Sequence, residues 1–149
     1  TIIVIILAGA TNLLSSGLNA GKYNLSMGHI MAPGRIAANT LADKLRIDAV
    51  SITSPALGAN ASQLTYNDSS GNVFVISYNS TAHSIVITKN GSADTGSPLA
   101  AGLVASLKFT RDNVDVRSIV VDIGFNDNAY SGSPTRTISM TVIMMNVTS

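Results

Sequence analysis

The 149-residue sequence contains no cysteine, which excludes a disulfide framework, a thiolate metal site, a catalytic cysteine and covalently attached haem. Glutamate is absent too: the acidic residues are eight aspartates, against nine lysines and arginines, and the net charge is +1. Charged residues make up 11% of the chain, whereas soluble domains carry roughly 25%. This balance gives no electrostatic reason to expect nucleic acid or an anionic membrane as a partner.

Motifs of catalysis are missing as well. No Gly-x-Ser-x-Gly arrangement forms a nucleophile elbow, and no glycine-rich phosphate loop follows a strand. His29 and His83 lie in different halves of the chain without acidic neighbours in sequence, so we do not expect them to bind a metal. The tyrosines are too scattered for a platform on which bases stack. We therefore predict neither an enzyme nor a nucleic-acid-binding protein, and no cofactor.

Two groups of polar residues leave alternatives open. Asp122, Asn126, Asp127 and Asn128 carry oxygen atoms of the kind that Ca²⁺ prefers, but an Asx-rich turn is the interpretation we favour, and no metal is predicted. Six Asn-x-Ser/Thr sequons also occur, of which chance alone gives several in a chain this rich in Asn, Ser and Thr. They begin at Asn24, Asn60, Asn67, Asn79, Asn90 and Asn146.

The first ten residues form an apolar run without charge. As a helix they would rise about 15 Å, half of a bilayer core, so this run alone cannot span a membrane. It also lacks the basic start and the small-residue exit of a cleavable signal peptide. Because the chain opens within an apolar run, we expect further residues upstream of Thr1.

Helical patterning continues to about Ile47, with weak points along it. Gly9, Gly17 and Gly21 each cost roughly 1 kcal/mol relative to alanine in a helix interior, so we expect this stretch to melt or stretch easily. Pro33, followed by Gly34, removes a backbone donor and predicts a kink or a short break.

Beyond Lys22 the helical segment becomes amphipathic. Ile30, Ala37, Leu41 and Leu45 recur at helical spacing and are predicted to pack the helix onto a sheet. After an expected loop at residues 51–62, alternation predicts six strands joined by tight turns. Their predicted ranges are residues 63–66, 73–78, 84–88, 103–110, 114–125 and 135–146. The expected fold class is thus α+β, a long N-terminal helix packed on an antiparallel β-sheet.

Four stretches share patterns with one known family. Residues 1–9 are an apolar helix that reaches a glycine at Gly9, and residues 35–46 close with Leu-Ala-Asp-Lys-Leu-Arg. Residues 99–110 include Ser-Leu-Lys-Phe, and residues 116–123 read Val-Arg-Ser-Ile-Val-Val-Asp-Ile. In this order and spacing they resemble type IV pilins and pseudopilins, over most of the chain. The Phe and Glu of that family's processing motif are absent, as is the disulfide loop of many pilins.

This resemblance implies a structural subunit of an extracellular type IV pilus-like helical filament. Residues 1–24 would be the apolar helix of the membrane or filament core, and residues 25–149 the globular head. The implied partners are copies of the chain itself and, before polymerisation, an inner-membrane assembly platform. The implied locations are the inner membrane first and the cell surface afterwards. The residues predicted to pack in the filament core are Thr1, Ile2, Ile3, Val4, Ile5, Ile6, Leu7, Ala8, Gly9, Ala10, Leu13 and Leu14.

Two alternatives stay open. The C-terminal patterns also suit a minor pseudopilin that primes or tips a short fibre in type II secretion or DNA uptake. A different class is a carbohydrate- or surface-binding β domain tethered by one helix. A tether needs roughly 20 continuous apolar residues, and polar side chains interrupt the helix here. They are Asn12, Ser15, Ser16, Asn19 and Lys22.

Overall fold

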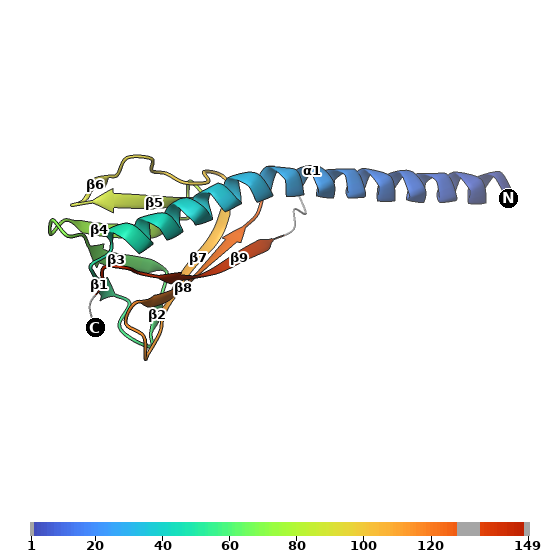
Figure 1. The fold of residues 1–149 in the computed structure, drawn as a ribbon. Coiled ribbons are helices and arrows are strands. Elements are labelled where there is room, and N and C mark those ends of the chain that lie inside the picture. Colours follow the sequence, from blue (N-terminus) through green and yellow to red (C-terminus); the bar gives the residue numbers. More distant parts are fainter. Residues whose placement is uncertain (1, 128–134, 148–149) are drawn as a thin grey trace.

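A computed structural model describes residues 2–127 and 135–147, with the side chains described from Leu13 onward except that of Ser26. Its longest element is α1 (Ile2–Asp48), which extends well beyond the strands at its N-terminal end (Figure 1). At 1.5 Å per residue such a helix is about 70 Å long. Pro33 lies inside α1 without interrupting it. The burial of Ile30 and Ala37 on either side of Pro33 holds the helix in place there.

The first sheet is formed by the middle of the chain. It contains β1 (Ser51–Ser54), β3 (Gln63–Asn67), β4 (Val73–Asn79), β5 (Ser84–Lys89) and β6 (Ser92–Ala93), in the order β1-β3-β4-β5-β6. All neighbours are antiparallel. The turn between β3 and β4 is built by Asp68, whose Oδ1 accepts the backbone N–H groups of Ser70 and Asn72, and by Gly71 at a φ of 79°.

The second sheet comes mostly from the C-terminal third. It contains β2 (Asn60–Ala61), β7 (Val104–Arg111), β8 (Ser118–Phe125) and β9 (Arg136–Ile143), in the order β2-β7-β8-β9, again antiparallel. Arg111 at the end of β7 ties the two sheets together, because its guanidinium donates to the backbone oxygens of Ile52 and Pro55. Its partial burial lowers the pKa of the Arg111 guanidinium.

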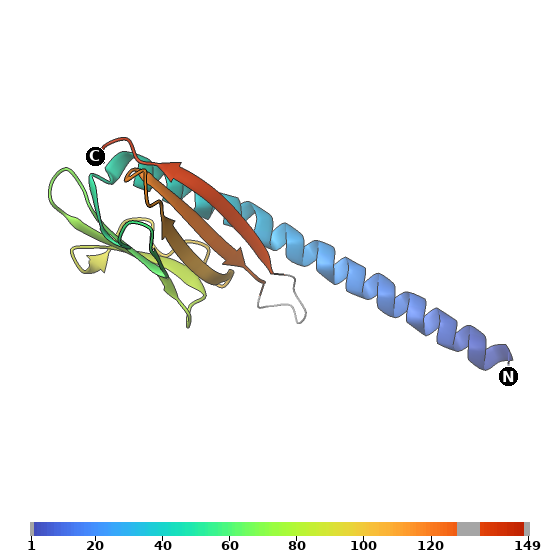
Figure 2. The ribbon, with the colours of Figure 1, turned by 90° about the horizontal axis from the view of Figure 1, so that it is seen from below.

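One hydrophobic core joins the two sheets and α1, and α1 contacts β8 and β9 directly (Figure 2). The C-terminal segment fastens the end of α1: the backbone N–H of Met145 donates to the carbonyl of Arg46, and the Asn146 amide donates to that of Ile47. These bonds satisfy carbonyls that a helix end leaves without partners. The largest fully buried side chains are Tyr66, Phe109, Phe125, Ile30, Leu41, Leu45, Leu64, Ile76, Ile85, Ile119, Ile123 and Met144.

The expected fold class is therefore wrong. In place of a helix on one six-stranded sheet, the described residues form nine strands in two sheets. β1 and β2 lie in the stretch expected to be a loop, and β6 lies in an expected turn. The physical reason is that alternation reports a half-buried strand but not the partner with which it pairs. Edge strands of two to four residues are too short to show a period at all.

Candidate functional site

The inward face of α1 attaches the helix to the sheets. Ile30, Ala37, Leu41 and Leu45, the residues predicted to pack there, are at most 2% exposed. Gly34 belongs to the same face, and it allows a close approach: a β-carbon added to it would lie 3.3 Å from Cε2 of Phe125. Gly34 thus has a packing role, whereas it was predicted to weaken the helix.

A second apolar face runs along the opposite side of α1. At 100° per residue its members fall within roughly 60° of one another, turned away from the inward face. Each of these side chains is between 59% and 66% exposed. They are called the outer stripe here and consist of Leu14, Leu18, Leu25, Ile36 and Ile47.

The outer stripe runs along two parts of α1 that differ in their surroundings. Residues 13–25, the projecting half, lie mostly beyond the strands, and residues 27–48, the head-bound half, lie along them (Figure 1). The boundary is marked by Arg136 of β9, which donates to the Tyr23 hydroxyl and, over 3.5 Å, to Sδ of Met27. Next to it, His29 Nδ1 lies 3.4 Å from a carboxylate oxygen of the buried Asp127. The head-bound half and the two sheets together form the head.

Charges beside the outer stripe are few. Lys22 lies between Leu18 and Leu25 in sequence, and it is the first Lys, Arg or Asp of the chain. Asp43 lies between Ile36 and Ile47, with 66% of its side chain exposed and its Oδ1 3.5 Å from Nη1 of Arg46. The projecting half therefore offers one positive group beside its leucines, and the head-bound half offers an exposed carboxylate beside its isoleucines.

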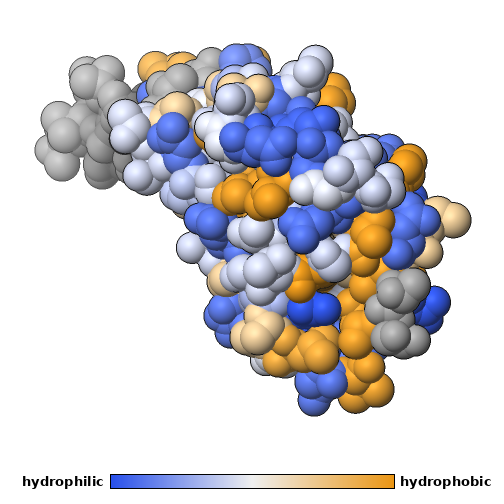
Figure 3. Space-filling view, turned by 90° about the vertical axis from the view of Figure 1, so that its left-hand side faces the viewer, coloured by the Kyte–Doolittle hydropathy of each residue, from blue (hydrophilic) through white to orange (hydrophobic). Residues whose placement is uncertain are grey.

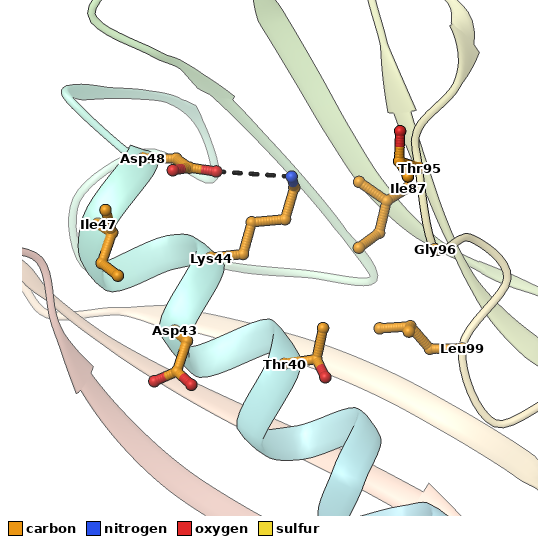
Figure 4. Close-up of a pocket in the computed structure, with 9 residues that line it drawn as sticks. All are labelled: Thr40, Asp43, Lys44, Ile47, Asp48, Ile87, Thr95, Gly96 and Leu99. Atoms are coloured by element: carbon orange, nitrogen blue, oxygen red, sulfur yellow. Dashed lines mark ion pairs between the residues drawn. The ribbon is translucent and has the colours of Figure 1, made fainter.

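A shallow pocket of about 270 Å³ adjoins the end of the outer stripe (Figure 4). Thr40, Asp43, Lys44, Ile47 and Asp48 line it from α1, and Ile87, Thr95, Gly96 and Leu99 line it from the first sheet and the segment after β6. The head surface seen from this end mixes small hydrophobic groups with polar ones (Figure 3).

Lys44 holds the two walls of this pocket together. Its ammonium lies 2.7 Å from Asp94 and 3.5 Å from Asp48, and 4.6 Å from the ring centre of Phe74. Phe74 in turn stacks on Tyr66, with ring centres 5.1 Å apart. Burial, and then the nearby aspartates, raise the pKa of the Tyr66 hydroxyl well above its usual value. This cluster is a structural clasp, made of an ion pair, a cation–π contact and a ring stack.

The predicted filament-core residues are placed only in part. Thr1 lies outside the described residues, as do the side chains of the other members up to Ala10. Leu13 and Leu14 are exposed on the projecting half. Of the glycines predicted to melt the helix, Gly9 falls in the stretch without described side chains, and Gly17 and Gly21 lie inside α1 facing open space.

The possible calcium ligands do not converge where they are described. Asp122 accepts the hydroxyl of Ser139 at 2.5 Å, Asp127 is buried beside His29, and Asn128 lies outside the described residues. Over residues 2–127 and 135–147, no three His, Asp, Glu or Cys side chains are grouped to hold a metal ion.

The outer stripe was missed from the sequence, although a signal was present: Leu14, Leu25, Ile36 and Ile47 are spaced by eleven residues, or three helical turns. Along the described part of α1 no segment is both long enough and apolar enough to cross a membrane. Comparisons with models of protein families, with curated proteins and with solved structures gave no match to this chain.

Proposed function

We propose that this chain is a structural subunit that polymerises with copies of itself into a type IV pilus-like helical filament on the cell surface, with α1 inside and the heads outside. The observation that carries this function is the outer stripe. Isolated exposed leucines are ordinary on protein surfaces, but a line of them on one helix face is typical of a face that packs against another helix.

The energetic reason is the area that the outer stripe leaves in water. Burying one large aliphatic side chain completely is worth about 1.5–3 kcal/mol, and each member is already about one-third buried. Five such side chains along one subunit provide a driving force of several kcal/mol per contact.

The position of the outer stripe favours packing between helices over membrane anchoring alone. Ile36 and Ile47 lie on the head-bound half, where the same helix is packed against the strands. A membrane anchor does not require exposed aliphatic side chains on the part of the helix that is packed against the strands. In a filament, both halves of α1 contact neighbouring subunits.

The low charge of the chain also suits polymerisation. Charged residues make up only 11% of it, and the net charge is +1, so that copies packed side by side repel one another little. Before assembly, the apolar start of α1 would be held in the inner membrane beside an assembly platform, as the resemblance of residues 1–9 to pilins implies.

Electron microscopy of the native surface fraction, with helical averaging, tests this function. We expect fibres whose core is made of α1 helices and whose outside is made of heads. Monomers or membrane-tethered globules under all conditions would contradict the filament.

A further inference from the structure

Building on the filament proposed above, we propose that contacting subunits pack α1 against α1 in parallel with an axial offset of 22 residues, about 33 Å. The projecting half of one subunit then lies on the head-bound half of the next. The surface recognised is the outer stripe, and its partner is a second copy of the same chain.

The spacing of the outer stripe sets this offset. Leu14 and Ile36 are 22 residues apart, and so are Leu25 and Ile47. A shift of 22 residues therefore brings Leu14 and Leu25 of one copy level with Ile36 and Ile47 of its neighbour. Because 22 residues complete six turns to within roughly 40°, the aligned side chains also share a face.

Charge favours the same alignment. With this offset Lys22 comes level with Lys44 of the neighbour, one residue away from Asp43. The Lys44 ammonium is held at Asp94 and Asp48, on the pocket side of α1, while the Asp43 carboxylate is exposed beside the outer stripe. Lys22 thus meets a carboxylate, and Leu25 reaches Ile47 at the rim of the pocket.

The length of the head-bound half is compatible with the offset. It runs from Met27 to Asp48, which is also 22 residues, so the head-bound halves of copies shifted by this distance do not share a level. Each copy uses its projecting half for one contact and its head-bound half for another. Such a head-to-tail interface does not close on itself and generates an open filament.

A shift of eleven residues is the competing register, because it also aligns Leu14 with Leu25 and Ile36 with Ile47. It places Lys22 level with Pro33, where no carboxylate lies in sequence. With this shift, one contact occupies three of the four evenly spaced positions of the outer stripe on each copy. Too few positions then remain for the contact with the following subunit.

Cysteine pairs measure the offset directly, because the chain has no cysteine of its own. We would introduce Leu14→Cys with Ile36→Cys, oxidise the fibres, and separate the chains without reducing agent. Within one helix these positions are about 33 Å apart, far beyond the roughly 7 Å limit for a disulfide, so every bond formed joins two copies. The expected result is a ladder of linked multimers.

The control pair is Leu14→Cys with Leu25→Cys, which reports the shift of eleven residues. It should give no ladder. Fibres in which this control pair links and the first pair does not would overturn the offset but leave the filament intact. An unsubstituted chain that forms no fibres would overturn the filament and the offset together.

A double-mutant cycle on Lys22 and Asp43 is independent of the cysteines. Lys22→Ala and Asp43→Ala should each raise the critical concentration for polymerisation about two- to fivefold. The double variant should be no worse than either single variant, because the two groups lose the same contact. Fully additive effects would contradict the proposed alignment.

Discussion

The two halves of α1 bury their apolar residues to different degrees. The head-bound half covers its inward face with the two sheets, so that Leu41 and Leu45 are fully buried, while Ile36 and Ile47 on its other side are not. The projecting half leaves Leu14, Leu18 and Leu25 exposed. The difference shows that one helix can carry two apolar faces: one is buried in the core of the fold, and the other is exposed to solvent.

The strongest test of this contrast is a matched pair of leucine truncations. Leu41→Ala should lower the free energy of unfolding by about 2–5 kcal/mol, because it opens a cavity in the core. Leu18→Ala should leave that free energy within about 0.5 kcal/mol, since an exposed leucine loses little on truncation. Urea unfolding of the monomer, followed by circular dichroism, measures both.

Polymerisation should respond in the opposite way. Leu18→Ala should raise the critical concentration about tenfold, which corresponds to about 1.4 kcal/mol of lost apolar burial. Sedimentation of the fibres provides the measurement. A Leu18→Ala chain that polymerises like the unsubstituted one would separate the outer stripe from assembly.

Two glycine substitutions in α1 test the same contrast, and their effects on stability should be the next largest. Gly34→Val should cost about 1–3 kcal/mol, because the new side chain meets Phe125 and Ile138 at contact distance or closer. Gly21→Ala should stabilise the projecting half by up to about 1 kcal/mol, since a β-carbon there meets open space. Unfolding of the first variant and the helicity of the second report these effects. A destabilising Gly21→Ala substitution would mean that this position is packed.

Two cations near the end of α1 have smaller and unequal effects. Lys44 lies 2.7 Å from Asp94, and both side chains are less than one-fifth exposed, so Lys44→Ala should cost about 1–2 kcal/mol, including its contact with the Phe74 ring. Arg46→Ala breaks an exposed pair at 3.5 Å and should cost at most about 0.5 kcal/mol. Thermal unfolding of the two variants compares them, and equal losses would argue against the clasp.

Some of this arrangement could be predicted from the sequence. The 3.6-residue period places Ile30, Ala37, Leu41 and Leu45 on one face because burial against a sheet selects small and apolar residues there. The central strands could be found because their alternation is long enough to show a period. These patterns indicate which face of each helix or strand is buried, but not which other element it packs against.

The division into two sheets could not be predicted, because the pairing of edge strands is decided by contacts distant in sequence. Arg111 reaches Ile52 across 59 positions, and no local pattern encodes such a contact. The outer stripe was hidden for another reason. A helix with apolar residues on two opposite faces shows little net amphipathicity, so a search for one apolar face passes over the second.

Lowering the pH should destabilise the head but not the projecting half, and this should be the smallest of the predicted effects. The pKa of Asp112 is lowered by the hydrogen bonds that its carboxylate accepts from the N–H groups of Val114 and Asp115. The pKa of Asp68 is lowered first by the side-chain amide of Asn72 and then by backbone N–H groups, and the pKa of Asp115 is lowered by the backbone N–H and the guanidinium of Arg117. Groups with a lowered pKa in the folded state stabilise it above their usual pKa of 3.8. That contribution is lost as the pH falls through the lowered values.

Residues 1–42 contain no carboxylate side chain, so the helicity of the projecting half should not follow this titration. Thermal unfolding of the head between pH 5 and pH 2.5 should therefore show a decline that is shallower when all three aspartates are replaced by asparagine, whose side-chain carbonyl still accepts the backbone N–H bonds. An unchanged decline would assign the acid sensitivity to other groups of the head.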